Sequence, residues 1–93
     1  MSTQVVVYTM KGCPYCVELK ELLVKEHIDF VDRDIEENEE EYDLFTQVVE
    51  NDYVPALLII KEGGEKPLSF LYAPERDYNE LTEALDLVKG HLL

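Results

Sequence analysis

The sequence predicts an α/β protein in which a four-stranded mixed sheet is flanked by three helices, in the order βαβαββα. Three observations support this prediction. A valine-rich run covers Gln4–Thr9, a continuous apolar run covers Ala56–Ile60, and apolar residues recur at helical spacing in three further segments. With 93 residues, 46% of them hydrophobic, we expect one domain, 1–93, with a core of its own.

The first βαβ unit begins at the valine-rich run. Gln4–Thr9 is predicted to be a buried strand because it is almost continuously apolar. A helix follows the turn at Lys11-Gly12-Cys13, since four apolar residues share one of its faces: Cys16, Leu19, Leu22 and Leu23. The short polar run Asp29–Asp34 predicts a strand at the sheet edge. A right-handed crossover makes the two strands parallel.

Two further helices are each predicted by a cap pair and an apolar face. Asn38 and Glu41 resemble a capping box, and the helix that they begin runs to about Glu50. Its inward-facing residues are expected to be Tyr42, Phe45, Val48 and Val49. Asp77 and Glu80 offer a second cap pair, which begins the last helix. Its apolar face consists of Tyr78, Leu81, Ala84, Leu85 and Val88.

Glycines and prolines mark the remaining boundaries. Gly90 is expected to end the last helix. A turn with two glycines, residues 62–65, joins the central strand Ala56–Ile60 to an antiparallel strand at Leu68–Tyr72. Pro67 at the start of that strand suits a sheet edge. The resulting strand order is 2-1-3-4, which is the thioredoxin-like arrangement.

The charge of the chain limits its partners. The formal net charge is −13, from 21 acidic and 8 basic residues, which argues against nucleic acid or an anionic membrane surface. No window is apolar enough to span a membrane, and the first residues lack a signal-peptide pattern. We therefore expect a cytoplasmic protein, where a close thiol pair is catalytic or metal-binding. The acidic run Asp32–Asp43 is expected to be solvated, or else to steer a basic partner.

Both cysteines lie in one short motif, Cys13-Pro14-Tyr15-Cys16. Cys13 falls where the first strand ends and the first helix begins, with Pro14 at the first helical position. The free amides of Tyr15 and Cys16, the helix dipole and the positive charge of Lys11 all favour a thiolate at Cys13. Cys16 lies on the apolar helix face and is expected to be buried. This asymmetry suits thiol–disulfide exchange, with Cys13 as nucleophile, Cys16 as resolving thiol and a redox-active disulfide between them.

Two other uses of the cysteine pair remain open at this point. Half a zinc site would need two more ligands, and the histidines, His27 and His91, lie far apart in the sequence. We therefore expect no metal. A structural disulfide would close a very short loop and constrain little of the unfolded chain.

Two further residues are candidates for substrate contact. Pro55 precedes the central strand and is expected to form a cis bond with Val54, in a turn that faces the cysteines. The Val54 backbone would then be free to pair with an extended substrate. An ordinary trans proline is the alternative. Tyr15 is expected to be exposed and to contact substrate, and packing against the second helix is its alternative.

These residues resemble the glutaredoxin family. The motif Cys13-Pro14-Tyr15-Cys16 is identical to the active-site motif of dithiol glutaredoxins, and Lys11 and the Val54-Pro55 pair match the family in type and spacing. The resemblance implies a monomeric oxidoreductase that reduces protein disulfides and glutathione mixed disulfides, with glutathione as co-substrate and no bound cofactor. It also implies a glutathione groove lined by Lys11, Tyr15, Val54 and Pro55.

The segment after the last strand departs from the family. Glutaredoxins usually carry a Gly-Gly pair and an acidic residue there, whereas residues 72–77 resemble the corresponding turn of thioredoxins. Asp77 is assigned the acidic glutathione contact, with Glu80 as its competitor. Two alternatives follow for the function. The first is a redoxin reduced by thioredoxin reductase, which serves a protein such as ribonucleotide reductase. The second is a carrier of a [2Fe–2S] cluster, although relatives of that kind usually have smaller residues in place of Pro14 and Tyr15.

Overall fold

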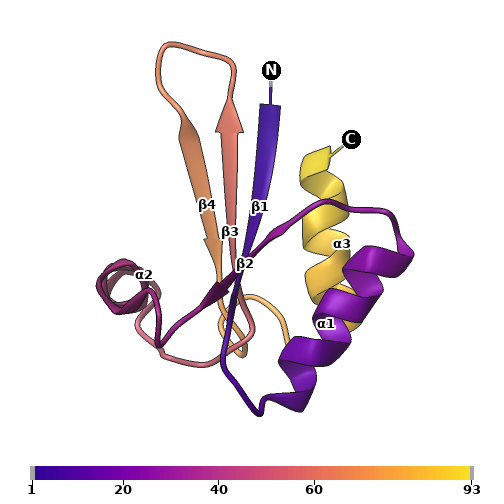
Figure 1. The fold of residues 1–93 in the computed structure, drawn as a ribbon. Helices are drawn as coiled ribbons and strands as arrows, with labels where there is room; N and C mark the ends of the chain where they lie inside the picture. The colour runs from indigo at the N-terminus through magenta and orange to yellow at the C-terminus, as the bar shows by residue number, and fades with distance from the viewer. Residues whose placement is uncertain (1, 93) are drawn as a thin grey trace.

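The computed structural model describes residues 2–92 and contains four strands and three helices in the predicted order (Figure 1). The elements are β1 (Ser2–Thr9), α1 (Pro14–Lys25), β2 (Val31–Asp34), α2 (Glu39–Val49), β3 (Ala56–Glu62), β4 (Leu68–Tyr72) and α3 (Leu81–Leu92). None of the helices within this part of the chain is long and apolar enough to cross a membrane.

The sheet has the predicted order, β2-β1-β3-β4. β1 pairs with β2 in parallel, and the pairs β1–β3 and β3–β4 are antiparallel. The polar strand β2 lies at the edge, where the side chain of Thr9 donates a hydrogen bond of 2.6 Å to Asp32. This arrangement confirms the thioredoxin-like α/β fold.

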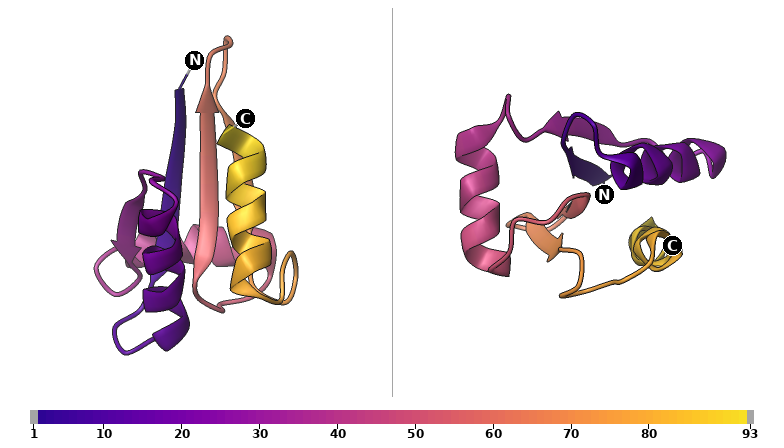
Figure 2. Two further views of the ribbon diagram at one scale, coloured as in Figure 1. Left: turned by 90° about the vertical axis from the view of Figure 1, so that its right-hand side faces the viewer. Right: turned by 90° about the horizontal axis from the view of Figure 1, so that it is seen from below.

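The helices form layers on both faces of the sheet, with α1 and α3 on one face and α2 on the other (Figure 2). Val5 and Val7 of β1 face the core beneath α1 and α3, whereas Val6 and Tyr8 face the core beneath α2. Successive side chains of a strand point to opposite faces, so a strand covered on both sides must be apolar throughout. This explains the valine-rich run.

The start and the inner face of α2 differ from the prediction. Asn38 makes no side-chain cap; instead its amide group donates to the Asp34 carbonyl. Glu41 is not available for a capping box because its carboxylate accepts a hydrogen bond from Tyr8 at 2.6 Å. Val48 was expected to face inward but is 64% exposed. It lies about a quarter turn outside the face formed by the buried residues Tyr42, Phe45 and Val49.

Both ends of α3 also differ from the prediction. The helix starts at Leu81, and the cap is made by the Glu83 carboxylate, not by an Asp77–Glu80 pair. At the other end the helix runs through Gly90 to Leu92. A glycine costs a helix only about 1 kcal/mol, and the residue after it, His91, packs its ring on Phe70.

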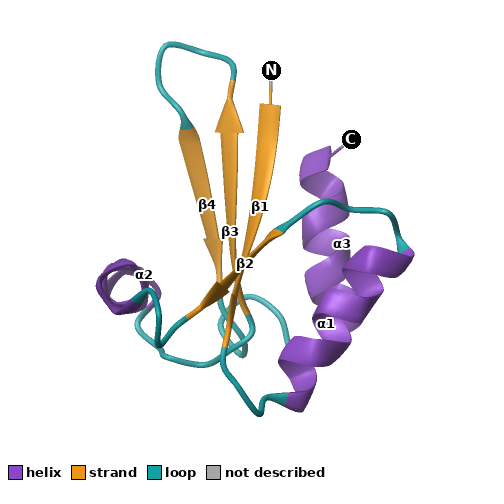
Figure 3. Cartoon of the chain, in the orientation of Figure 1, coloured by secondary structure: helices purple, strands orange, loops and turns teal. Residues whose placement is uncertain are grey.

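Three connections meet at one end of the sheet (Figure 3). They are the turn between β1 and α1, the loop between α2 and β3, and the loop between β4 and α3. The loop between β3 and β4 lies at the opposite end (Figure 3). The three connections hold Cys13, Pro55 and Asp77, and Cys16 lies in the first turn of α1, so the predicted site residues gather at this end.

Candidate active site

Cys13 occupies the N-cap position of α1. The chain reaches it through Gly12, whose φ of +77° lies in the left-handed region that favours glycine. The Cys13 amide donates to the Met10 carbonyl at 3.3 Å and closes this turn. Pro14 follows at the first helical position, where its missing N–H group leaves no hydrogen bond unmade. The local sequence therefore places the Cys13 side chain at the open end of the helix.

The Cys13 sulfur accepts a hydrogen bond from a backbone amide of the same helix. The donor is the N–H of Cys16, and the distance from N to Sγ is 3.2 Å. The Tyr15 amide, which was expected to take part, makes no such bond. A backbone N–H and the positive end of the helix dipole both stabilise negative charge on the sulfur. The geometry therefore suits Cys13 to act as a nucleophile.

Cys16 has a different environment. Its side chain is 1% exposed, whereas that of Cys13 is 8% exposed, and both are free cysteines. Burial, followed by the hydrogen bond with the Cys13 side chain, raises the pKa of Cys16 to about 12. Cys16 is therefore a neutral thiol at neutral pH, behind a more accessible sulfur.

The loop before β3 supplies the opposite wall of the site. The Val54–Pro55 peptide bond is cis, as the sequence predicted. The buried Tyr78 donates a hydrogen bond from its hydroxyl to the Pro55 carbonyl. Burial is the main cause that raises the pKa of Tyr78, so this hydroxyl keeps its proton. The backbone of Val54 has no hydrogen-bond partner among residues 2–92, so it is available to a ligand.

A groove of about 1060 Å³ lies beside the cysteines, with Tyr15 on one side and the loop before β3 on the other, and neither cysteine is among its lining residues. Three of the predicted glutathione contacts line it, namely Tyr15, Val54 and Pro55. Lys11 is exposed but does not line the groove, and neither does Asp77. Tyr15 is 64% exposed, which agrees with a role in contacting substrate rather than packing.

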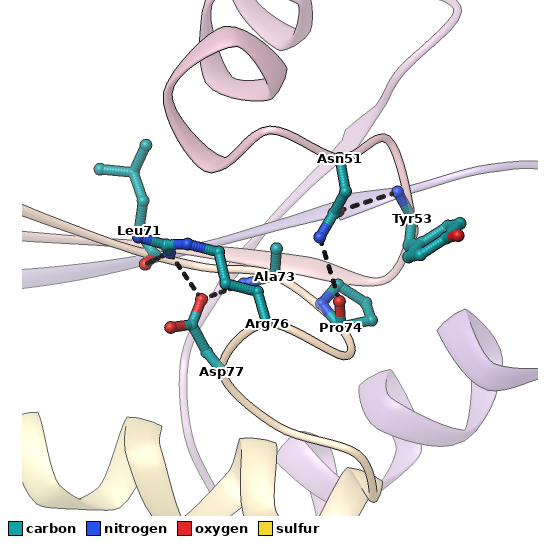
Figure 4. A network of polar contacts seen from close by, with 7 residues as sticks. All are labelled: Asn51, Tyr53, Leu71, Ala73, Pro74, Arg76 and Asp77. Atoms are coloured by element: carbon teal, nitrogen blue, oxygen red, sulfur yellow. Dashed lines mark hydrogen bonds and ion pairs between the residues drawn. The ribbon is translucent and has the colours of Figure 1, made fainter.

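Asp77 is engaged by its own chain (Figure 4). Its carboxylate accepts hydrogen bonds from the Ala73 amide at 2.8 Å and from the Arg76 guanidinium at 2.7 Å. Arg76 also donates to the Leu71 carbonyl at 3.4 Å. Glu80, the competing candidate, does line the groove. The structure thus brings Glu80 to the site and leaves Asp77 in the adjoining turn.

Some residues of the site escaped the sequence analysis. Asn51 donates to the Pro74 carbonyl and accepts from the Tyr53 amide, both at 3.2 Å, so it joins the two loops (Figure 4). Asparagine before a turn is a common side-chain-to-backbone bridge, which was the available indication. Tyr78 was expected only to belong to the apolar face of the last helix. Its contact with Pro55 spans 23 residues, and no local pattern predicts such a contact.

The thioredoxin-like fold, the thiol pair at a helix start and the cis proline across the groove define the class of thiol–disulfide oxidoreductases. A family model described as Glutaredoxin matches residues 5–63, which is more than half of the chain. The chain therefore belongs to the glutaredoxin family, and it is a thiol–disulfide oxidoreductase. A search of curated proteins gave no match.

The match to the family has a definite extent. Residues 5–63 include both cysteines and Pro55, and they end after β3. The turn that contains Asp77 lies beyond them. Within residues 2–92, no three histidine, cysteine, aspartate or glutamate side chains are grouped so that they could hold a metal ion.

Proposed function

We propose that this protein reduces protein disulfides and glutathione mixed disulfides through Cys13 and Cys16, with glutathione as its electron donor. The observation that carries the proposal is the position of the Cys13 sulfur. It lies at the start of α1, accepts the Cys16 amide at 3.2 Å, and has a buried second thiol one helical turn away. The family match and the Val54–Pro55 turn support the same reaction.

The first half of the reaction oxidises the protein. The Cys13 thiolate attacks one sulfur of the substrate disulfide, forms a mixed disulfide and expels the other sulfur as a thiolate, which takes a proton. Cys16 then loses its proton and attacks the Cys13 sulfur. The bond from Cys13 to the substrate breaks, the second substrate thiolate leaves, and a Cys13–Cys16 disulfide remains. The substrate gains two electrons from the protein and two protons, one that Cys16 loses and one from solvent.

The second half restores the dithiol. One glutathione thiolate attacks Cys13, forms a mixed disulfide and releases Cys16 as a thiol. The thiolate of a second glutathione then attacks the sulfur of the bound glutathione. Glutathione disulfide leaves, and Cys13 is released as a thiolate. Two glutathione molecules thus supply the two electrons. For glutathione mixed disulfides Cys13 alone suffices, because its mixed disulfide with glutathione is resolved by another glutathione.

Each groove residue has a proposed part in binding. The Val54 backbone pairs with the extended backbone of the ligand, as an added strand would. The Tyr15 ring contacts the substrate beside Cys13, and Lys11 supplies positive charge at the approach. Because the Asp77 carboxylate is occupied by Ala73 and Arg76, we assign the acidic contact with the glutathione amino group to Glu80.

Substitution of each cysteine tests this mechanism. Cys13→Ser is expected to abolish all exchange, because it removes the nucleophile. Cys16→Ser is expected to retain turnover of a small glutathione mixed disulfide and to lose most turnover of a protein disulfide, because only the latter needs a resolving thiol. The measurement is oxidation of NADPH by glutathione reductase, coupled to reduced glutathione.

Full activity of the Cys13→Ser variant would refute the mechanism. Equal loss of both activities in Cys16→Ser would mean that Cys16 does more than resolve the mixed disulfide.

The acidic lining of the groove favours a second candidate for the electron donor. Glutathione is an anion, and five of the six charged side chains that line the groove are acidic. A thioredoxin reductase would supply electrons without placing glutathione in this groove. Slow turnover with glutathione, together with fast reduction of the oxidised protein by a thioredoxin reductase, would favour that donor.

A further inference from the structure

The groove beside the cysteines is strongly acidic. Its charged lining residues are Glu18, Glu21, Lys25, Asp52, Glu75 and Glu80. None of the five carboxylates takes part in an ion pair or a side-chain hydrogen bond with any residue from 2 to 92. Their charges are therefore not compensated within this part of the chain, and a substrate meets all of them.

Few groups in the groove are suited to bind an anion, since Lys25 is the one basic side chain among the described residues of its lining. The segment before α3 also lines the groove, and two of its amides are taken by the chain itself. The Glu83 carboxylate accepts from the Asn79 amide at 3.3 Å and from the Glu80 amide at 3.0 Å. The Arg76 guanidinium is held by Asp77 at 2.7 Å. An anionic ligand in the groove would therefore meet one basic side chain, Lys25, against five carboxylates.

The groove also offers surface to an extended chain. Tyr15, Tyr53 and Met10 line it and are 64%, 51% and 41% exposed, so their apolar surfaces are open to a partner. The unpaired Val54 backbone lies among them. Exposed aromatic side chains and a free backbone edge are the features by which proteins bind extended segments.

We infer that the protein substrates of this groove are disulfides within extended, positively charged segments, whose lysine or arginine side chains pair with Glu18, Glu21 and Glu75. Three observations carry this inference: the five carboxylates of the lining that are unpaired within residues 2–92, the single basic side chain among them and the open apolar surface. Charge complementarity of this kind raises association rates by about 10- to 1,000-fold at low ionic strength. The inference rests on the proposed function, because it names the substrate class of the same Cys13 chemistry.

The test uses two fluorogenic peptide disulfides that are identical except that lysines in one replace glutamates in the other. Each is mixed with pre-reduced protein in a single turnover, so no glutathione is needed. At low salt, the basic peptide is expected to react at least 10-fold faster. The ratio should fall toward one near 1 M salt, where the screening length is only about 3 Å.

A matched pair of variants locates the effect. The groove variant carries Glu18→Gln, Glu21→Gln and Glu75→Gln and is expected to lose most of the preference. The control variant carries Glu36→Gln, Glu62→Gln and Glu65→Gln, which change the net charge equally at exposed positions outside the groove. It should keep the preference. An equal loss in both variants would show that net charge, not the groove, selects the substrate, and would overturn the inference.

The same experiment separates this inference from the proposed function. Equal rates for the two peptides with wild-type protein overturn the inference and leave the Cys13 chemistry intact. No reaction with either peptide, while Cys13 is shown to be reduced by thiol titration, overturns the proposed reduction of protein disulfides.

Discussion

At the scale of single residues, the two cysteines show how position changes one chemical group. Cys13 has an amide donor at 3.2 Å and a path to solvent, whereas Cys16 is buried. The difference arises from a spacing of three residues at a helix start, which puts one thiol at the cap and the other on the inner face. Local rules of helix geometry suffice for this, so the sequence alone predicted the positions of both thiols.

This contrast predicts the pH dependence of alkylation. Because the pKa of Cys16 is raised to about 12, its thiolate fraction at pH 8 is about one in 10,000, and it grows about tenfold per pH unit. In the wild-type protein, iodoacetamide is expected to modify Cys13 alone below pH 9. Peptide mapping by mass spectrometry measures the modification at each site. Equal modification of Cys16 at pH 8 would contradict the burial argument.

Other residues could not be assigned from the sequence, and the reason is distance along the chain. Tyr78 bonds the Pro55 carbonyl, and Asn51 bonds the Pro74 carbonyl, each across 23 residues. Asp77 was assigned to glutathione because its charge and approximate place matched the family. Its carboxylate is instead used to hold its own turn. Several acidic residues lie close together there, and only the fold decides which of them reaches the groove.

At the scale of elements, the predictions were right where a pattern covered a whole strand or helix. The strands β1 and β3 and all three helices follow from apolar runs and periodicity, and the cis Val54–Pro55 bond was predicted from its place before β3. The errors fall at element ends and at the margins of faces. Val48 belongs to the apolar set of α2 by composition, yet the sheet touches only one narrow face of that helix. The expected caps did not form, and the side chains of Asn38, Glu41 and Asp77 are hydrogen-bonded elsewhere.

The end of α2 offers a test of stability. Glu50 adopts a left-handed conformation with φ of 61°, and its amide donates to the Thr46 carbonyl. Only glycine takes this conformation without steric cost. Glu50→Gly is therefore expected to raise the free energy of unfolding by about 0.5–1 kcal/mol, measured by urea denaturation with circular dichroism.

The control for this substitution is Gln47→Gly, at an exposed position inside the same helix. There a glycine should lower stability by about 1 kcal/mol, because the backbone is helical. A loss of stability in both variants would show that the strain at Glu50 is negligible.

At the scale of the whole molecule, the net charge of −13 determines how the stability of the protein depends on salt. The longest extent of the chain is 37 Å, and the screening length is about 30 Å at 0.01 M salt but about 8 Å at 0.15 M. Charges across the whole protein therefore repel one another at low salt and are screened at physiological salt. The melting temperature is expected to rise when NaCl is increased from 0.01 to 0.15 M.

Thermal unfolding followed by circular dichroism measures this rise. The variant with Glu36→Gln, Glu62→Gln and Glu65→Gln should show a smaller rise, because it carries three fewer negative charges. A melting temperature that falls with salt would mean that the four ion pairs found among residues 2–92 contribute more than the overall repulsion.

The loops of the groove all lie at one end of the sheet, while β1 starts and α3 finishes at the other end (Figure 1). The start of β1 and the end of α3 are therefore suitable points for attaching another molecule. An affinity tag, a fluorescent reporter or an electrode linker joined beyond Ser2 or Leu92 extends away from Cys13. Such a fusion can be anchored to a solid support while the groove beside Cys13 stays open to the solution, which makes the protein suited to use as an immobilised redox sensor.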